Sequence, residues 1–333
     1  MLGGHDLDVR PERRPERPQP FHRIGVGLIG GSIARAAREY DVVRSIVATA
    51  RSEATRRRVI ELGIADQVVE TNAEAAKDAD LVIVCIPVGA SGPVTAEIAA
   101  SLKPGAILSD VGSVKTAVLK DMAPHVPAGV HLIPAHPVAG TENSGPDSGF
   151  PELFVNRWCI LTPPQGADPA AVERLRAFWA ALGANVEIMT AEHHDMVLAI
   201  TSHLPHLIAY TIVGTAEEFS TVSRSEVLKF SAGGFRDFTR IAASDPTMWR
   251  DVFLHNKEAV LEMLAQFNED LSRLTRAMRR GDGEFLFDHF TRTRAIRRGI
   301  VQIGQDSAAP DFGRTHPAKP VAPIARPYAA DNE

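Results

Sequence analysis

A glycine-rich turn near the N-terminus constrains the fold more than any other feature of this sequence. Gly25, Gly27 and Gly30 match the pattern G-x-G-x-x-G, and residues 31–36 continue as a helical pattern. Glycine is needed here because the turn is tight, the backbone must approach a pyrophosphate, and the helix must pack closely on a sheet. An isolated motif of this kind could also be a turn that binds nothing. The cofactor contacts predicted in this turn are Gly25, Gly27, Leu28, Ile29 and Gly30.

The first half of the chain alternates short apolar runs with helical patterns. Such alternation predicts right-handed βαβ units and a parallel sheet with helices on both faces, which favours a dinucleotide site at the glycines. Two later runs flank an amphipathic helix and are expected to extend the same sheet. The apolar runs lie at residues 45–49, 81–86, 106–108, 130–134, 158–162 and 186–189.

The second half is predicted to be helical. Residues 190–305 carry one helical pattern after another, interrupted by a glycine pair at 233 and 234, interpreted as a loop, and by a helix start at Asp245 and Pro246. An apolar helical domain of this size commonly buries its remaining surface against a second copy, so we expect a homodimer. The expected fold class is α/β: a Rossmann-like, doubly wound parallel sheet over residues 21–189, followed by an all-α dimerisation domain.

Composition narrows the class of protein. The 333 residues suit two domains of about 100 to 200 residues each. Disordered ends are predicted at 1–20 and 306–333, where apolar side chains are too few to offset the entropy of ordering. The 36 basic and 41 acidic residues form no basic stripe, which argues against a nucleic-acid partner.

Cysteine usage and hydropathy point to a cytoplasmic protein. Cys85 and Cys159 each lie in an apolar run, so they predict neither a disulfide framework nor a metal site. No uninterrupted apolar run reaches the roughly 18 residues of a membrane span, and the N-terminus lacks the apolar core of a signal peptide. We therefore expect no membrane partner.

Two features near the glycine turn bear on cofactor binding. Only residues 21–24 separate Pro20 from the first glycine, so the first strand is expected to be about three residues short, which could weaken cofactor binding. After the second strand, Ala50 stands where NAD enzymes usually place an acidic residue, and Arg51 follows. Loss of the carboxylate and a nearby arginine favour a 2′-phosphate, although residues 51–58 could instead be a solvated basic face. NAD or NADP is expected, with a lean toward NADP.

Three loops beyond the carboxyl ends of the predicted strands carry polar residues, and ligands bind at this edge of an open parallel sheet. Pro87 could wall a nicotinamide ring, and Ser113 is either a helix cap or a hydroxyl aimed at a substrate. His136 precedes Pro137, which keeps it out of a helix. Its pKa near neutrality suits removal of a hydroxyl proton as hydride leaves the same carbon. The alternative is a structural loop histidine.

Five segments, in this order, resemble the prephenate/arogenate dehydrogenase family, and the resemblance covers roughly residues 21–305. The segments are residues 27–32, 110–115, 136–142, 202–206 and 233–240. The resemblance implies an NAD(P)-dependent enzyme of tyrosine biosynthesis. Its reaction would be the oxidative decarboxylation of prephenate to 4-hydroxyphenylpyruvate, or of arogenate to tyrosine.

The resemblance also implies roles for individual residues. His136 matches the catalytic histidine that accepts a hydrogen bond from the ring hydroxyl, Ser113 the hydroxyl that holds that group, and Arg240 the arginine that pairs with a substrate carboxylate. The other matching substrate residues are His206 near the same pocket, Thr141 and Glu142 at its mouth, His194 as a further pocket histidine, and Trp249 as an aromatic contributed by the neighbouring subunit.

Helical geometry offers a check on these roles. His203 and His206 are three apart and share a face, whereas His194 lies nine before His203 and falls on the opposite face of an ideal helix unless Pro205 kinks it. Asp237 and Arg240 could be only a surface ion pair. No zincin spacing accompanies the histidines, so no metal is expected.

Two competing functions remain open from the residues themselves. A β-hydroxyacid dehydrogenase shares this architecture, but it would need a catalytic lysine on the first interdomain helix, and residues 190–210 contain none. A binding protein that senses NAD(P)H without turnover would not need His136, Ser113 and Arg240 together.

Overall fold

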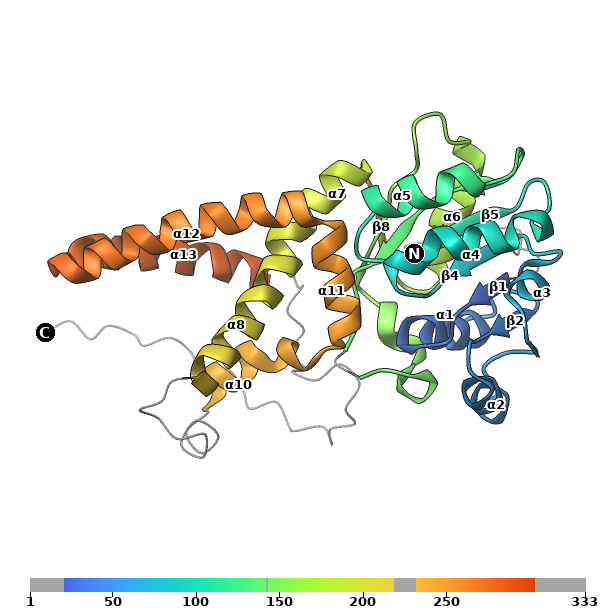
Figure 1. Cartoon of the computed structure of the whole chain (residues 1–333), viewed down its shortest axis with the longest axis horizontal. Coiled ribbons are helices and arrows are strands. Elements are labelled where there is room, and N and C mark those ends of the chain that lie inside the picture. The colour runs from blue at the N-terminus through green and yellow to red at the C-terminus, as the bar shows by residue number, and fades with distance from the viewer. Residues whose placement is uncertain (1–20, 142, 219–231, 303–333) are drawn as a thin grey trace, which may run out of the picture.

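The computed structural model describes residues 21–141, 143–218 and 232–302. Figure 1 shows a sheet covered by helices and a set of longer helices that projects from it. The predicted disordered ends at 1–20 and 306–333 lie outside the described residues and stay predictions.

The large sheet is six-stranded and parallel, in the order β3-β2-β1-β4-β5-β6. The order reverses between β1 and β4, which is where doubly wound sheets bind ligands. The predicted doubly wound parallel sheet is therefore confirmed. The hydrophobic pattern of the sequence does not predict strand β3, because the strand is short and none of its three residues is fully buried. The strands are β1 Phe21–Ile24, β2 Ile46–Thr49, β3 Gln67–Val69, β4 Leu81–Val84, β5 Ile107–Asp110 and β6 His131–Leu132.

The central strand β1 is no shorter than the strands it joins. Its four residues pair along their whole length with β2 on one side and β4 on the other. Strands β2, β4 and β5 also have four residues each. The expectation that β1 is too short for its central place is corrected by this pairing.

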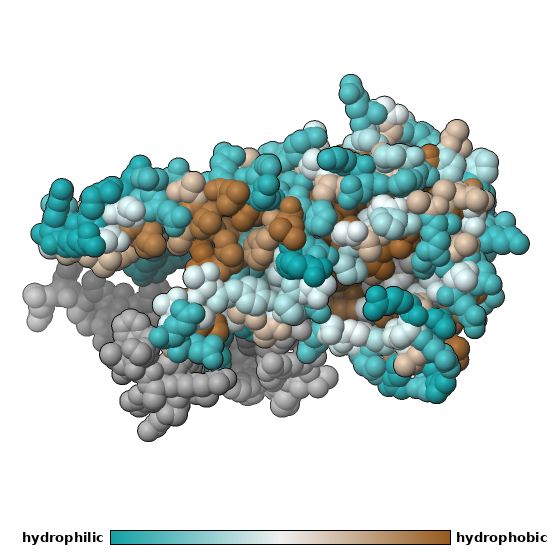
Figure 2. Space-filling view, viewed as in Figure 1, coloured by the Kyte–Doolittle hydropathy of each residue, from teal (hydrophilic) through white to brown (hydrophobic). Residues whose placement is uncertain are grey.

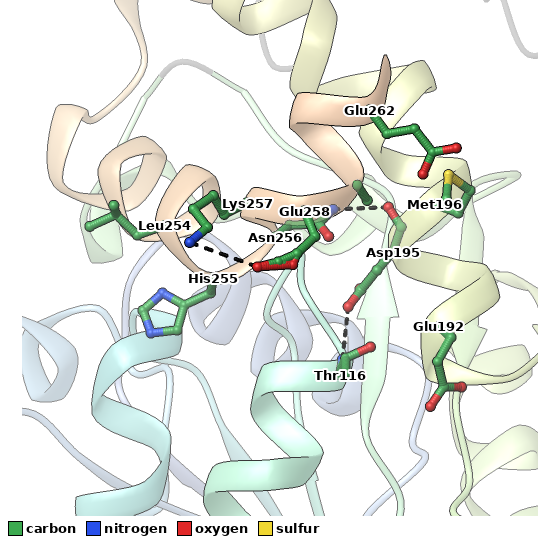
Figure 3. Close-up of a pocket in the computed structure, with 11 residues that line it drawn as sticks. Thr116, Glu192, Asp195, Met196, Leu254, His255, Asn256, Lys257, Glu258 and Glu262 are labelled. Carbon is green, nitrogen blue, oxygen red and sulfur yellow. Dashed lines mark hydrogen bonds and ion pairs between the residues drawn. The ribbon is translucent and has the colours of Figure 1, made fainter. Parts of the chain in front are cut away.

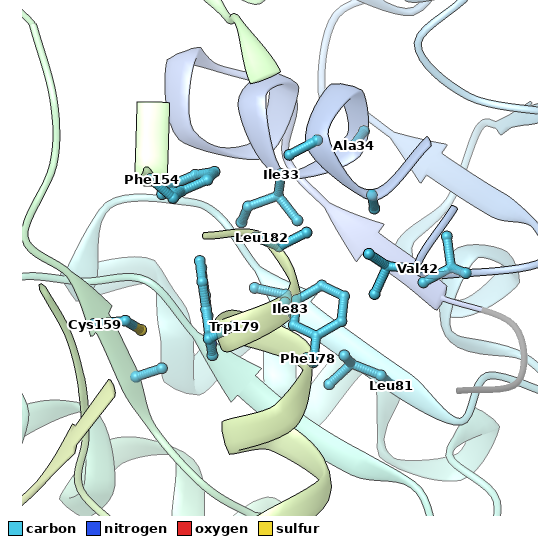
Figure 4. Packing of buried hydrophobic residues seen from close by; sticks show 14 of the residues in the cluster. Ile33, Ala34, Val42, Leu81, Ile83, Phe154, Cys159, Phe178, Trp179 and Leu182 are labelled. Atoms are coloured by element: carbon cyan, nitrogen blue, oxygen red, sulfur yellow. The ribbon is translucent and has the colours of Figure 1, made fainter. Parts of the chain in front are cut away.

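Helices cover both faces of the sheet, and strand β4 shows how the core is divided. Leu81 and Ile83 face one apolar cluster, while Val82 and Val84 face the other, because successive side chains of a strand point to opposite faces. In Figure 4, Ile83 lies among Ile33 of the first helix and the large rings of residues 178 and 179. The helices of this part are α1 Leu28–Glu39, α2 Glu53–Glu61, α3 Asn72–Ala76, α4 Ser91–Ile98, α5 Thr116–Met122 and α6 Pro169–Ala181, with short 3-10 turns η1 Val88–Ala90, η2 Ala99–Ser101, η3 Ala123–His125, η4 Pro146–Ser148 and η5 Pro151–Phe154.

The two later apolar runs do not extend the large sheet. They form β8 (Trp158–Leu161) and β9 (Asn185–Ile188) of a separate three-stranded sheet, in which β7 (Ala135–Pro137) pairs antiparallel with β8. Proline has no amide hydrogen, so Pro134 and Pro137 cannot donate to a neighbouring strand, and the chain leaves the large sheet after β6. The predicted extension is wrong, whereas the amphipathic helix between the two runs is present as α6.

From residue 190 onward the described chain is helical, as predicted. Asp245 caps α11 by accepting a hydrogen bond from the Met248 amide at 2.9 Å, which confirms the predicted helix start. Gly233 and Gly234 form the first turn of α10 rather than a loop, so that interpretation is corrected. The elements are α7 Ala191–Leu198, the π-helical turn η6 Ala199–His203, α8 Leu204–Glu218, α10 Gly233–Thr239, the 3-10 turn η7 Arg240–Ala243, α11 Pro246–His255, α12 Lys257–Arg280 and α13 Gly283–Gln302.

The continuous helix Ala191–Glu218 is long and apolar enough to cross a membrane by length and composition alone, with a mean hydropathy of 1.5. Its buried residues nevertheless include His194, Asp195 and His203. Ionisable groups are costly in a lipid-facing helix, and these three are packed against the rest of the protein. They anchor one side of the helix to the rest of the protein, although only 28% of its apolar window is buried.

The helical domain leaves large apolar side chains exposed. Figure 2 shows brown side chains gathered over this part of the molecule. On α12, Leu261 is 54% exposed, and on α13, Phe287 is 69% and Phe290 56% exposed. Apolar surface of this kind commonly marks an interaction face.

Candidate active site

The glycine turn has the shape that a dinucleotide requires. Gly25 has a φ of +91°, and a Cβ on it would lie 2.4 Å from the Cys85 carbonyl oxygen. A Cβ on Gly30 would lie 2.4 Å from the Gly25 oxygen, so α1 packs directly on the turn. A Cβ on Gly27 would meet nothing within 4 Å, which leaves open space where a pyrophosphate approaches.

Helix α1 begins at this open space. No side chain caps its N-terminus, so its first amides are available to phosphate oxygens. The predicted contact at Leu28 needs one refinement: its side chain is buried in the core, so only its backbone can face a ligand. The side chain of Ile29 is half-buried against the same core.

The loop after β2 is held by arginine. The Arg56 guanidinium donates to the carbonyl oxygens of Ala50 and Arg51, at 2.8 and 3.3 Å. Arg51 is exposed, and no acidic side chain of the described residues forms an ion pair with it. Arg57 and Arg58 instead pair with acids on the surface, as the solvated-face interpretation expects.

The loop after β4 lies where the two domains meet. Pro87 is exposed and precedes the turn η1. Helix α11 packs on this turn, and a Cβ on Gly89 would lie 3.3 Å from the His255 ring. The helical domain thus closes over the edge of the sheet where Pro87 was predicted to wall a nicotinamide ring.

His136 lies on β7 and is 8% exposed. Its Nδ1 lies 2.8 Å from Nε2 of His194, which comes from α7 of the other domain. Its Nε2 makes no hydrogen bond to a described residue and is not fully shielded from solvent. Burial holds the pKa of His136 well below 6.5, with the His194, Lys115 and His203 groups adding to the effect. The ring is therefore neutral at physiological pH and can accept a proton.

His194 continues from His136 to a carboxylate. Its Nδ1 lies 2.8 Å from Oδ1 of Asp195. The Asp195 carboxylate also accepts the backbone amides of Lys115 and Thr116 at 2.7 and 2.9 Å, so it spans the domain boundary to the start of α5. Burial acts to raise the pKa of Asp195, but these hydrogen bonds together hold it below its usual value. Burial lowers the pKa of His194, and the bond to Asp195 opposes this only in part.

A buried ion pair lies beside His136. The Lys115 ammonium is 2.5 Å from Oδ2 of Asp110 and donates to the Ala135 carbonyl at 2.7 Å. Both side chains are almost completely buried. Burial lowers the pKa of Lys115, and the Asp110 carboxylate acts against this. Because Ala135 precedes His136, the pair fixes the backbone that carries the His136 ring.

His203 and His206 follow on the same helix. Nδ1 of His203 lies 3.0 Å from the Asn256 amide nitrogen, while its Nε2 is buried without a hydrogen bond of good geometry. Burial lowers the pKa of His203 to about 4. His206 stacks on Trp249 with ring centroids 3.6 Å apart. Burial also lowers the pKa of His206, and the Arg240 charge nearby adds to this.

The expectation that His194 and His203 lie on opposite faces assumes a uniform helix, and it stays a prediction. The helix passes through the π-helical turn Ala199–His203, where the wider turn changes the phase of the residues that follow. Sequence periodicity assumes a uniform helix and misses such a turn.

The remaining predicted residues have mixed outcomes. Ser113 is half-buried in the loop before α5, its main chain lies against His203, and its hydroxyl has no hydrogen-bond partner among the described residues. Thr141 is half-buried and its hydroxyl accepts the Asn143 amide at 3.2 Å. Arg240 begins η7 and lies near His206. Glu142 lies outside the described residues.

Two pairings bear on the expected roles. Asp237 is bonded to Arg236 at 3.0 Å, so the suggested surface pair with Arg240 is not the one that forms. Trp249 is only 6% exposed and packs in its own chain against His206 and Phe253. Its contribution to a neighbouring subunit's site stays a prediction.

Sequence reasoning missed Asp195 and Asn256 and gave no role to Lys115 and Asp110. Asp195 directly follows His194, and an acid beside a candidate histidine was an available signal. No signal could bring Asn256 to Asp195, because its amide reaches the Asp195 carbonyl at 2.9 Å across 61 residues of sequence.

Figure 3 shows Asp195 and Asn256 at the wall of a pocket. Its lining includes the acids Glu192, Glu258 and Glu262 but neither His136 nor Arg240.

The fold and this site define a two-domain oxidoreductase that binds a dinucleotide and holds a neutral histidine at the domain boundary. Family models of the prephenate dehydrogenase nucleotide-binding and dimerization domains match residues 33–188 and 190–292. The chain belongs to the prephenate dehydrogenase family.

Several characterised proteins and structures resemble the chain over most of its length. A cyclohexadienyl dehydrogenase from Zymomonas mobilis is 42% identical over 277 residues, covering 83% of this chain and 94% of that protein. A prephenate dehydrogenase from Bacillus subtilis is 33% identical, covering 86% and 77%. The structure of prephenate dehydrogenase from A. aeolicus with hydroxyphenyl propionate and NAD+ has a TM-score of 0.79 at 30% identity, covering 86% of this chain and 99% of that one. These likenesses confirm the family and its NAD(P) dependence.

Proposed function

We propose that this protein catalyses the NAD(P)+-dependent oxidative decarboxylation of prephenate, or of arogenate, in tyrosine biosynthesis. The observation that carries the proposal is His136, a neutral buried histidine with an open Nε2, which His194 of the helical domain contacts at the domain boundary. When bound, the dinucleotide supplies the hydride acceptor. Names of relatives at 42% and 33% identity support the same substrate class.

In the proposed reaction, His136 handles a single proton. Its Nε2 takes the proton of the ring hydroxyl as hydride leaves the carbinol carbon. The bond between the ring and its carboxylate then breaks, carbon dioxide leaves, and the electron pair enters the ring and makes it aromatic. The oxygen becomes a phenolate and takes the proton back from His136. Hydride and carbon dioxide are lost, and no proton has to reach solvent.

Other residues would hold the substrate. Arg240 suits a carboxylate because its guanidinium is planar and always charged. The hydroxyl of Ser113 is available to the ring hydroxyl, and His206 lies near Arg240. Thr141 and Glu142 are proposed at the mouth of the pocket. The Trp249 ring stacks on His206 and would hold that ring in place.

We propose that the enzyme uses NADP as well as NAD, with a lean toward NADP. Ala50 offers no carboxylate to repel a 2′-phosphate, and Arg51 is exposed beside it without a paired acid among the described residues. Gly25, Gly27, Leu28, Ile29 and Gly30 would bind the pyrophosphate through their backbone, with Pro87 against the nicotinamide.

A homodimer through the helical domain would cover the exposed apolar side chains of α12 and α13. The matched family model of this region is itself a dimerization domain. A cytoplasmic location, without nucleic-acid or membrane partners, fits the composition.

A spectrophotometric assay tests the proposal: purified protein is given prephenate or arogenate with NAD+ or NADP+, and reduced cofactor is followed. Turnover of at least one substrate is expected. Turnover of a simple β-hydroxyacid, or cofactor binding with no turnover of either compound, would contradict the proposal. The first outcome is disfavoured because residues 191–218 contain no lysine, and the second because a pure sensor needs no base.

A further inference from the structure

Asp195 ends a chain of hydrogen bonds that starts at the proposed reacting hydroxyl. The order is His136, then His194 at 2.8 Å, then Asp195 at 2.8 Å. The first residue belongs to the nucleotide-binding part and the other two belong to α7. In such a chain the protonated nitrogen of one ring determines which nitrogen of the next ring is protonated, because each neutral imidazole has one donor and one acceptor nitrogen.

We infer that Asp195, acting through His194, fixes the proton of His136 on Nδ1 and so keeps Nε2 as the proton acceptor. The inference rests on the proposed function of His136 as the base. Asp195 is thereby a positioning residue, since it touches neither substrate nor cofactor in this scheme.

The proton positions follow from Asp195 outward. Its oxygens already accept two backbone amides, from Lys115 and Thr116, and an amide can only donate. The carboxylate is therefore an acceptor toward His194 as well. His194 must carry its proton on Nδ1, which leaves its Nε2 as an acceptor. His136 then has to donate from Nδ1, and only its Nε2 lone pair remains for the substrate.

The opposite arrangement would disable the base. If His194 carried its proton on Nε2, it would donate to His136, whose own proton would move to Nε2. That nitrogen would then present a hydrogen to the ring hydroxyl and could not take a second proton without a lone pair. The His136 ring by itself does not favour the Nδ1-protonated form, so the selection of that form has to come from Asp195.

Asp195 would also stabilise the charged intermediate state of His136. While the ring holds the substrate proton, it is an imidazolium in a buried place. The groups that face it are His194, the Lys115 ammonium with its partner Asp110, and His203. Lys115 is already compensated by Asp110 at 2.5 Å, and the histidines are neutral. The Asp195 carboxylate is then the negative charge that remains for the imidazolium.

A purely structural role for Asp195 predicts different behaviour. Its bonds to the Lys115 and Thr116 amides hold the two domains together. Loss of this contact alone would lower the melting temperature and weaken binding of both ligands, and its effect would add to that of any change at His136.

The experiment compares Asp195→Asn, Asp195→Ala, His136→Asn and the double variant His136→Asn with Asp195→Asn, in the full-length enzyme with its substrate and cofactor. We expect kcat to fall about 100-fold in both Asp195 variants while the substrate KM changes less than about threefold. The kcat of the double variant should lie within about threefold of the kcat of His136→Asn, because the tautomer of residue 136 no longer matters once the histidine is gone. Additive losses, or an unchanged kcat, would overturn the inference.

Two further measurements keep the outcomes separate. Long-range 15N–1H NMR of protein labelled in the histidine rings should show His136 protonated on Nδ1 in the wild type and a mixture in Asp195→Ala; the same tautomer in both overturns the inference even if the wild type proves inactive on prephenate and arogenate. Asp251→Asn is the matched control, because this carboxylate is similarly buried at the domain boundary but pairs with Arg250. Its kcat should stay within about threefold of wild type.

Discussion

The nucleotide-binding domain and the helical domain bury their apolar side chains in different ways. In the first, β4 is completely buried and sends side chains into two closed clusters. In the second, the 24-residue helix α12 buries only Val260 and Ala277, and Phe287 and Phe290 on α13 stay exposed. The first domain buries its core within the chain, whereas the second leaves apolar surface exposed, which the proposed homodimer would cover.

The same division applies to the proposed chemistry. His136 and the cofactor turn belong to the self-contained domain, while Arg240 and the positioning histidine His194 belong to the one that needs a partner. Changes at His136 and at the two helical residues that position it, His194 and Asp195, should act mainly on kcat, whereas changes at Arg240 should act mainly on KM and changes on the exposed faces of α12 and α13 mainly on assembly.

The largest effect is expected at His136. His136→Asn should lower kcat by about 100-fold to 10,000-fold, the usual scale for a positioned acid or base, and leave cofactor affinity nearly intact. Stopped-flow turnover and cofactor titration by fluorescence measure the two quantities. Unchanged kcat would remove His136 from the mechanism.

Arg240→Ala should raise the substrate KM, with a loss of about 1.5 to 3 kcal/mol in kcat/KM, because it removes a charge-assisted contact to a substrate carboxylate from an arginine that is exposed in the structure. Steady-state kinetics at varied substrate measures this. Arg236→Ala is the matched control, because Arg236 is exposed and already paired with Asp237, and its KM should hardly change. A fall in melting temperature at constant KM would show that Arg240 is only structural.

Phe287→Glu should weaken the proposed dimer by about 2 to 4 kcal/mol, because it places a charge in an apolar interface. Sedimentation velocity over a range of concentrations gives the dissociation constant. Ile60→Glu is the control: this side chain is 63% exposed on α2 of the other domain and should leave assembly unchanged. Equal effects of the two substitutions would contradict the division between the domains.

Acid should destabilise the domain boundary. Burial lowers the folded pKa of His136, His194 and His203, the last to about 4 against 6.5 in the unfolded chain. Between pH 4 and pH 6.5 the unfolded chain binds more protons than the folded protein. The stability that the neutral histidines contribute is therefore present above pH 6.5 and is lost as the pH falls toward 4. His203 alone should reduce the free energy of unfolding by about 2 kcal/mol between pH 7 and pH 5.

Urea unfolding at the two pH values tests this, with His203→Gln as the variant that should show a flatter dependence. A wild type equally stable at both values would argue against neutral buried histidines.

The smallest effect concerns cofactor choice. NADP should be used with a kcat/KM within about tenfold of NAD or better, because Arg51 can pair with the 2′-phosphate. Ala50→Asp should shift the preference toward NAD by about tenfold through repulsion. Kinetics with both cofactors decide it. A strong NAD preference that the substitution leaves unaltered would mean that Ala50 is not at the ribose.

The sequence alone was sufficient for much of the fold because local patterns carry it. The glycine turn predicted the open space at Gly27, the apolar runs predicted β2, β4 and β5, and Asp245 predicted the start of α11. Each depends on neighbours within a few residues, where backbone sterics and side-chain period act directly.

The candidate site was only partly predictable. Segment resemblance singled out His136, Ser113 and Arg240, but the partners of His136 came from far along the chain. The tertiary structure alone decided that His194 reaches His136 across 58 residues, since only the packing of the two domains brings α7 to β7. It also decided that Asp195 bonds to the start of α5, because only packing of the two domains brings a carboxylate to those amides. Local sequence fixes which groups are present and how each short segment folds, while hydrogen bonds between domains depend on where the whole chain places them.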